Sequence, residues 1–151
     1  MHFQGLYKGL LKPLLWTVLL LAPSWVLAVD TSTAYLTINN IQASIQRNSA
    51  NDVVKRLATD FSYQDASKQS HSKTEYAQLL QKKISEINNY RFKILNSQRT
   101  IPQANGQYAM KFTLQENYSR SGASQQERHS QTWYFQELNG SILVTKIVLH
   151  D

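Results

Sequence analysis

Apolar and polar positions divide the chain into a helical first half and a strand-rich second half. The segment 33–48 carries apolar residues at spacings of three and four, which predicts one stripe of an amphipathic helix, formed by Ile38, Ile41 and Ile45. After a break at Asn48-Ser49, Asn51 is expected to cap a second, short helix. The core-facing residues of this second helix are expected to be Val53, Val54 and Leu57.

The third helix has the clearest start signal. Ser72 and Glu75 have the S-x-x-E spacing of a capping box, in which each side chain satisfies a free backbone N–H at the helix start. Apolar residues then follow at helical spacing until Asn88-Asn89: Tyr76, Leu79, Leu80, Ile84 and Ile87. Before this helix, 61–63 alternates like a short strand, and 64–71 is a polar loop.

From Tyr90 onward the pattern alternates with the period of two that is typical of strands. Strands are expected over 90–94, over 108–115 with one wet face, over 127–138, and over 141–149. Asn139-Gly140 is typical of a two-residue hairpin turn, since both positions of a type I′ turn need positive φ. This order predicts an α+β domain, in which a curved antiparallel sheet bends around helices to form a cone with an apolar interior.

Residues 1–28 have the pattern of a cleavable secretory signal. Lys8 and Lys12 precede an apolar run over 14–21, and small residues lead to a cleavage site between Ala28 and Val29. An uncleaved anchor is the alternative, although the run is shorter than the roughly 20 residues of a spanning helix. We expect a single domain over 29–151, beginning with a short mobile lead over 29–32. It would be periplasmic, in a Gram-negative bacterium, or secreted, with no stable membrane anchor after cleavage.

Composition excludes several classes of site. The chain has no cysteine, so it has no disulfides, no thiolate metal ligands and no lipidated cysteine. The formal net charge is +6, but Lys and Arg are scattered singly apart from Lys82-Lys83. A nucleic-acid binder would cluster them on one face, so we expect no nucleic-acid partner.

Several stretches resemble the NTF2-like superfamily, particularly its SnoaL-like and DUF4440-type members. They are 57–65 (LATDFSYQD), 72–76 (SKTEY) and the closing hairpin 132–144 (TWYFQELNGSILV). The Trp that usually follows the last turn of the family is replaced here by Ile142 or Leu143. The resemblance implies three N-terminal helices packed on the curved sheet of a cone.

The resemblance also implies where chemistry would lie, because enzymes of this superfamily place an acid–base Asp or His inside the cone. The matching candidates are Asp60, Asp65 and His71. In a catalytic interpretation Asp65 is the base, with a pKa raised by an apolar pocket, and Tyr63 or Tyr108 donates a hydrogen bond to an oxyanion. The favoured interpretation places Asp65 and His71 in a solvated loop and assigns no catalytic residue.

No cofactor or metal site is expected from the spacing of the histidines. His71, His129 and His150 are widely separated, and none belongs to an H-x-H or H-E-x-x-H motif. His129 is expected to be a lone histidine on a surface strand.

The aromatic residues have two interpretations. They could line a pocket for a small hydrophobic ligand, or they could fill the cone as core, which is the favoured interpretation. The set is Phe61, Tyr63, Tyr90, Phe92, Tyr108, Phe112, Trp133 and Phe135.

A further set on the last hairpin predicts an interface. If these side chains lie on the outer face of the sheet, they form an apolar patch that would serve a homodimer or a protein partner, as the resemblance implies. The set is Tyr134, Leu138, Ile142, Val144 and Val148. The alternative is that this strand is covered on both faces by its own chain.

The sequence supports two hypotheses about function. The first is an exported binding or interaction domain without catalysis, such as an accessory factor of envelope assembly or an immunity-type protein. The alternative is a SnoaL-like enzyme, or a carrier, for a small hydrophobic ligand in the cone. An open cavity containing a carboxylate or histidine would favour the alternative, and a filled cone would favour the interaction domain.

Overall fold

The computed structural model describes residues 29–150, so the predicted signal segment and Ala28 lie outside the described residues. Val29, the first described residue, is 2% exposed and belongs to the core. The next residue, Asp30, caps a helix by accepting a hydrogen bond from the Thr33 N–H at 2.6 Å. The expected mobile lead over 29–32 is therefore wrong, because its side chains already pack and cap. Within 29–150, no helix has the length and apolar character needed to cross a membrane.

Within residues 29–150, three α-helices form where the sequence pattern predicts them. They are α1 (Thr31–Gln46), α2 (Ala50–Val54) and α3 (Lys73–Glu86). The capping box of α3 is confirmed, with Ser72 and Glu75 each accepting from the backbone N–H of the other. The cap expected for α2 is wrong: Asn51 lies inside the helix and Ser49 is the capping residue.

The strands form one curved mixed sheet in the order β2-β1-β7-β6-β5-β3, with β4 paired to β5. Their bounds are β1 (Leu57–Gln64), β2 (Ser70–Ser72), β3 (Ile87–Leu95), β4 (Ile101–Pro102), β5 (Tyr108–Arg120), β6 (Ala123–Leu138) and β7 (Ser141–His150). A short 3₁₀ turn over Ala104–Gly106 precedes β5. Among the described strands β1 and β7 pair in parallel, while the other pairs are antiparallel.

The parallel pairing changes two local expectations. Leu57, expected on the second helix, begins β1 instead, because it pairs with Val144 of β7. The expected loop over 64–71 contains β2, which pairs back onto β1 through Ser62 to Gln64. Both pairings are long-range or loop-closing contacts that local periodicity does not encode.

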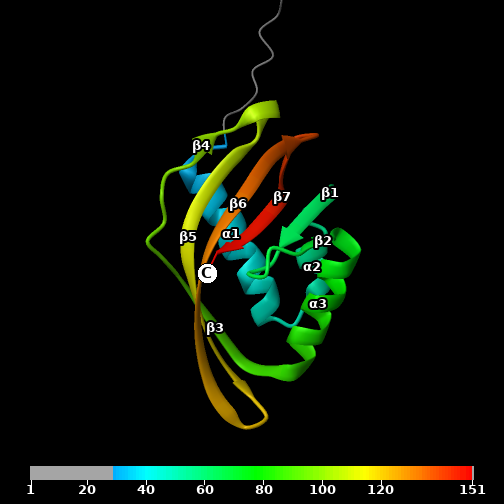
Figure 1. Ribbon diagram of the computed structural model, residues 1–151, viewed down its shortest axis with the longest axis vertical. Helices are drawn as coiled ribbons and strands as arrows, with labels where there is room; N and C mark the ends of the chain where they lie inside the picture. The colour runs from blue at the N-terminus through cyan, green and yellow to red at the C-terminus, as the bar shows by residue number, and fades with distance from the viewer. Residues whose placement is uncertain (1–28, 151) are drawn as a thin grey trace, which may run out of the picture.

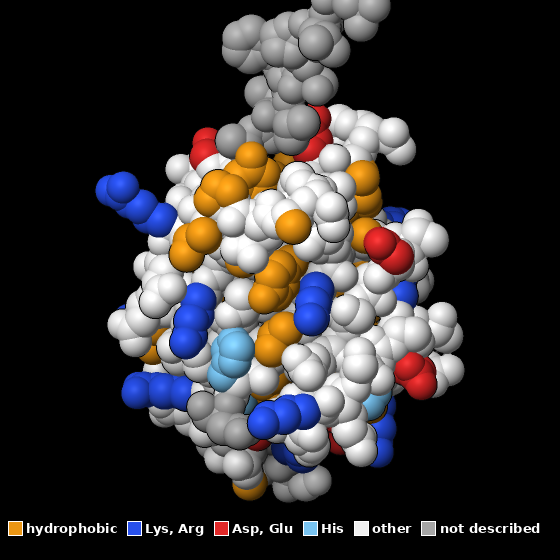
Figure 2. Space-filling model, turned by 45° about the horizontal axis from the view of Figure 1, so that its top comes forward, with side chains coloured by type: hydrophobic (Ala, Val, Ile, Leu, Met, Phe, Trp, Pro, Cys, Tyr) orange, Lys and Arg blue, Asp and Glu red, His pale blue; other side chains and the backbone are white. Residues whose placement is uncertain are grey.

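The helices gather on one side of the curved sheet, and the β5–β6 hairpin extends past them at the far end (Figure 1). The predicted α+β cone is thus confirmed, except that its sheet is mixed and not wholly antiparallel, because β1 pairs in parallel with β7. Its core lies between α1 and the sheet and is filled by fully buried side chains, the largest being Trp133, Phe112, Phe135, Ile38 and Ile41. On the outer surface turned forward in Figure 2, apolar side chains lie among Lys and Arg side chains that stand apart from one another.

The apolar set expected on the outer face of the last hairpin is divided by the fold. Val144 is 0% exposed and belongs to the core, and Ile142 packs against that core. The expectation that these two lie in an exposed patch is wrong, because a register shift between Tyr134 and Phe135 and the pairing with β1 turn them inward. Tyr134, Leu138 and Val148 are half-buried, and an interface through them stays a prediction.

Substitutions at two residues of α1 test how much the buried face of this helix contributes to the stability of the fold. Ile41 is 1% exposed, whereas Leu36 on the same helix is 59% exposed. We expect Ile41→Ala to lower the free energy of unfolding by about 2–5 kcal/mol, because it leaves a cavity in a packed core. Leu36→Ala should change it by less than about 0.5 kcal/mol. Urea denaturation of both variants measures this, and equal losses would contradict the assignment of the buried face.

Candidate functional site

A cavity of about 350 Å³ lies within the cone, between α1, α3 and the inner faces of β1, β5, β6 and β7. Leu79 of α3 lines it and is 45% exposed, so the cavity reaches solvent beside this residue. Its other lining residues are Gln42, Ile45, Tyr63, Asp65, His71, Tyr76, Leu80, Lys83, Leu114, Glu116, His129, Gln131, Trp133, Ile147 and Leu149. Nine of these sixteen lining residues are aliphatic or aromatic, and the other seven are charged or have hydrogen-bonding side chains.

The eight aromatic residues proposed from the sequence separate into wall and core. Tyr63 and Trp133 line the cavity, and Tyr76, which was not in that set, joins them. The remaining six pack in or against the core: Phe61, Tyr90, Phe112 and Phe135 are buried, and Phe92 and Tyr108 are half-buried. The core interpretation thus holds for most of the set, while the cone itself stays open.

Asp65 and His71 meet in this cavity. The antiparallel β1–β2 pairing places Tyr63 opposite His71, so Asp65, just beyond the end of β1, comes beside the same ring. His71 Nε2 lies 2.9 Å from Asp65 Oδ2, and Asp65 Oδ1 accepts from the Gln69 N–H at 2.9 Å. The side chain of Asp65 is 25% exposed and that of His71 is 21% exposed. The solvated-loop interpretation is wrong for this pair, because β2 folds the loop back over the cavity.

The role predicted for Asp65 is also corrected. The His71 hydrogen bond, followed by the bond from the Gln69 N–H, holds the pKa of Asp65 below its ordinary value, although partial burial opposes the change. A carboxylate with a lowered pKa is a poor base near neutral pH. Asp65 is better suited to orient His71: a neutral imidazole that donates Nε2–H to it keeps Nδ1 as the unprotonated nitrogen.

Two tyrosines lie next to this pair. The ring of Tyr63 stacks on His71 with centroids 5.8 Å apart, and Tyr76 packs on Tyr63 at 5.0 Å. Burial, and then the nearby Asp65 and Glu116 carboxylates, raise the pKa of Tyr63. Burial also raises the pKa of Tyr76. Both phenols therefore keep their protons and can donate hydrogen bonds. Asp60 and Tyr108, the other sequence candidates, do not line the cavity.

A second charged group in the cavity wall centres on Glu116 of β5, which is 3% exposed. Its Oε1 accepts a hydrogen bond from Tyr90 of β3 at 2.7 Å and one from the Lys83 ammonium of α3 at 2.8 Å. The Tyr90 hydroxyl also lies 2.6 Å from the amide oxygen of Gln42 on α1. A buried carboxylate is thereby paired and hydrogen-bonded, as its desolvation requires.

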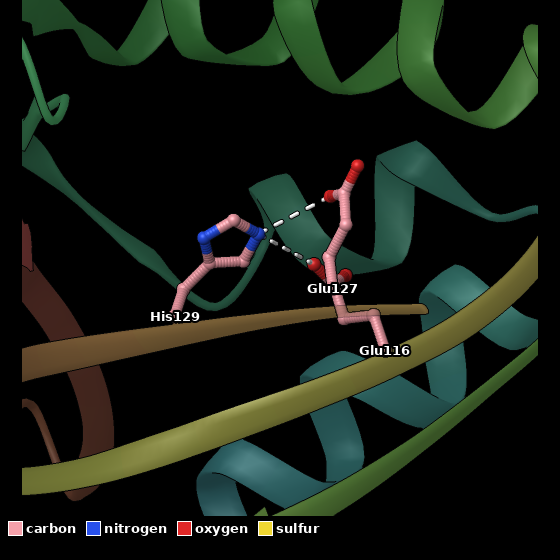
Figure 3. Close-up of side chains that lie close together, drawn as sticks. All are labelled: Glu116, Glu127 and His129. Atoms are coloured by element: carbon pink, nitrogen blue, oxygen red, sulfur yellow. Dashed lines mark hydrogen bonds and ion pairs between the residues drawn. The ribbon is translucent and has the colours of Figure 1, made fainter. Parts of the chain in front are cut away.

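Glu127 and His129 of β6 lie beside Glu116 and point away from the strands toward the helices (Figure 3). His129 Nε2 lies 3.2 Å from Glu127 Oε2 and 3.8 Å from Glu116 Oε2. The other oxygen of Glu127, Oε1, accepts a hydrogen bond from the Tyr118 hydroxyl. The expectation of a lone surface histidine is wrong for His129. His71 and His150 do not belong to this cluster. His150 Nε2 lies 2.8 Å from the Thr132 hydroxyl.

The sequence did contain a signal for this second group. The inward alternation of β5 from Tyr108 to Leu114 continues to Glu116 and Tyr118. In β6 the inward face, which includes Trp133 and Phe135, continues at every second position back through Gln131 to 129 and 127. Polar residues at inward positions of otherwise apolar strands indicate a functional or strongly hydrogen-bonded site.

Comparisons with known proteins identify the fold. No protein-family model matches the sequence, and no curated protein matches it significantly. Among solved structures, a candidate aromatic ring hydroxylase from Novosphingobium aromaticivorans matches with a TM-score of 0.70 and 7% identity, over 80% of this chain and 87% of that one. A ketosteroid isomerase-like protein from Erwinia carotovora atroseptica matches with a TM-score of 0.64 and 8% identity, over 80% and 94%.

A third match is the beta subunit of benzoate 1,2-dioxygenase from Burkholderia mallei. Its TM-score is 0.66 at 6% identity, over 80% of this chain and 89% of that one. The resemblance to NTF2-like and SnoaL-like proteins is thus confirmed at the level of the fold. This fold is shared by enzymes and binding proteins, so it does not by itself assign a function.

The lowered pKa of Asp65 gives a prediction about acid stability. In the unfolded chain its hydrogen bonds are absent, so its pKa returns to the ordinary 3.8. A depressed pKa stabilises the fold above that value, and the stabilisation is lost as the pH falls through the folded pKa. We expect the free energy of unfolding to decline less steeply below pH 3.8 in Asp65→Asn than in the unaltered protein.

Urea unfolding at a series of pH values measures the two slopes. Tyr63→Phe is the matched control, because it keeps Asp65, His71 and the stacked ring and should follow the unaltered protein. Identical slopes for Asp65→Asn and the unaltered protein would contradict the hydrogen-bonded ionised state of Asp65.

Proposed function

We propose that the cavity binds a small, largely apolar organic molecule and that His71, oriented by Asp65, exchanges protons with it. The observation that carries this proposal is the Asp65–His71 pair in the wall of an open cavity of about 350 Å³. Ligand sites are commonly concave and mostly apolar, with a few polar groups and a volume of roughly 300–1,000 Å³. The cavity has such a volume, and more than half of its lining residues are aliphatic or aromatic.

The geometry supports abstraction of a proton from a carbon next to a carbonyl group. His71 Nδ1 would accept the proton, giving an imidazolium that the Asp65 carboxylate stabilises through Nε2–H. The electron pair left on carbon moves into the carbonyl and places negative charge on its oxygen. Tyr63 or Tyr76, kept protonated in the wall, would donate a hydrogen bond to that oxygen. His71 then returns a proton to carbon, either the same one or one that it has exchanged with solvent.

The cavity favours this function over the interaction domain without catalysis that was preferred from the sequence. A protein that acts only through its outer surface gains nothing from an unfilled interior, because empty volume costs packing energy. The proposed export of the protein to the periplasm rests on the signal pattern of residues 1–28 and is compatible with either role.

Binding can be followed through Trp133, which lines the cavity. The chain has three tryptophans, so replacing Trp16 and Trp25 by Phe leaves Trp133 as the fluorescent reporter. We expect 2-tetralone, a two-ring ketone, to change its emission in a saturable way. Leu79→Arg should weaken this binding by putting a charge where the cavity meets solvent. Leu36→Arg is the control, being exposed and outside the lining, and equal effects of the two would contradict binding in the cone.

Proton transfer can be measured as deuterium uptake by 2-tetralone in D₂O, followed by NMR. We expect the protein to accelerate the exchange and His71→Phe to remove about 10²–10⁴-fold of the rate, the usual contribution of a general base. Asp65→Asn should shift the pH profile of the rate, because it changes how His71 is held. Leu36→Ala serves as the folded control. Full activity in His71→Phe would exclude this residue as the base.

A further inference from the structure

We propose that Glu116, Glu127 and His129 form a binding site for a divalent first-row metal ion, with Zn²⁺ as the cation of choice, in the wall of the same cavity. This site uses none of the atoms of the Asp65–His71 pair, so it can be tested independently of the function proposed above. It is argued from geometry, from the hydrogen bonds around the ligands and from charge.

The first argument is convergence of three ligand atoms from two adjacent strands. Glu116 Oε2 and Glu127 Oε2 both face His129 Nε2, at 3.8 and 3.2 Å. The candidate ligand atoms all lie within 4.8 Å of one another. Since Zn²⁺ binds nitrogen and oxygen ligands at about 2.0–2.2 Å, a cation among these atoms needs only small rotations of the side chains. Figure 3 shows the three side chains on the same side of the β5–β6 pair.

The second argument is that the remaining carboxylate oxygens are already held by other groups. Glu127 Oε1 accepts from Tyr118, and Glu116 Oε1 accepts from Tyr90 and Lys83. Each carboxylate is thereby fixed by one oxygen while the other faces His129. Hydrogen bonds of this kind orient the ligands in known metal sites and tune their affinity.

The third argument is electrostatic. Glu116 and Glu127 are directly opposite in the β5–β6 register, on the inward face, where two like charges repel. Lys83 compensates one of them through a hydrogen bond to Oε1, whereas Oε2 is the oxygen that pairs with His129. Apart from the imidazole, two carboxylates and one ammonium leave one uncompensated negative charge, which a divalent cation would reverse.

The ligand set also indicates the kind of site. Three protein ligands leave further coordination positions, and Glu116 and His129 line the cavity, so these positions would face its interior. Sites that keep an open position bind water or a substrate oxygen, whereas purely structural zinc sites are filled by protein ligands. A ligand with an oxygen donor could therefore contact the metal from within the cone.

Titration of the full chain with Zn²⁺ tests this proposal. The protein is made without a polyhistidine tag, treated with a chelator and titrated by calorimetry near neutral pH. We expect one Zn²⁺ per chain, and a loss of affinity in Glu116→Gln, Glu127→Gln and His129→Asn that exceeds the roughly 10–100-fold typical of removing an outer hydrogen bond. Tyr118→Phe, which keeps all three ligands, should lose affinity within that 10–100-fold range.

The matched control is His150→Asn, because His150 is bonded to Thr132 and lies outside the cluster. It should bind Zn²⁺ as the unaltered protein does. A second readout avoids dependence on folding of the variants: ¹⁵N NMR of the unaltered chain should show Zn²⁺ moving the Nε2 signal of His129 but not that of His71.

Absence of Zn²⁺ binding, or binding that survives His129→Asn, would overturn the proposal. In that case the cluster is a hydrogen-bonded structural network that joins β5, β6 and α3. Deuterium exchange by the His71 pair in chelator-treated protein separates the two hypotheses. Exchange without zinc binding would refute the metal site alone, and zinc binding without exchange would refute the acid–base function alone.

Discussion

The buried carboxylate of Glu116 imposes the strictest constraint on the interior of the cone. Moving a carboxylate out of water costs several kcal/mol unless it is paired and hydrogen-bonded, and its partners come from separate elements. Lys83 reaches it from α3 and Tyr90 from β3, while Gln42 of α1 contacts Tyr90 in turn. These helices and strands can therefore shift only at the cost of leaving a charge unpaired. The Lys83–Glu116 contact joins α3 to the sheet in the wall of the cavity.

The cavity contains two polar groups of different character. One is the hydrogen-bonded Asp65–His71 pair on the short β1–β2 ladder, and the other is the cluster of Glu116, Glu127 and His129 on the β5–β6 ladder. Tyr63 lies where both carboxylate groups influence it, since burial and then Asp65 and Glu116 raise its pKa. A negative, partly dry interior thus keeps the phenols protonated as donors. An apolar ligand bearing one carbonyl oxygen would meet complementary groups in such a cavity.

Much of the fold could be predicted because its signals are local. Helical spacing placed α1 and α3 within about two residues, the capping box marked the start of α3, and Asn139-Gly140 marked the last hairpin. The site was harder to predict because its groups come together only through strand pairing. Glu116 and His129 nevertheless occupy inward positions of strands whose alternation was recognised, so extending the alternation by a few residues would have identified them.

The sequence by itself determined the order of the three helices and the longer strands, the inward faces of β3, β5 and β6, and the α+β class, because side-chain periodicity is a property of neighbouring residues. Tertiary structure alone decided which aromatics fill the core and which line the cavity, and it turned Val144 inward through the parallel pairing of β1 with β7. It also decided that Asp65 and His71 form a pair, since β2 folds back on β1. These outcomes depend on contacts between residues distant along the chain or across a turn, and such contacts leave no period in the sequence.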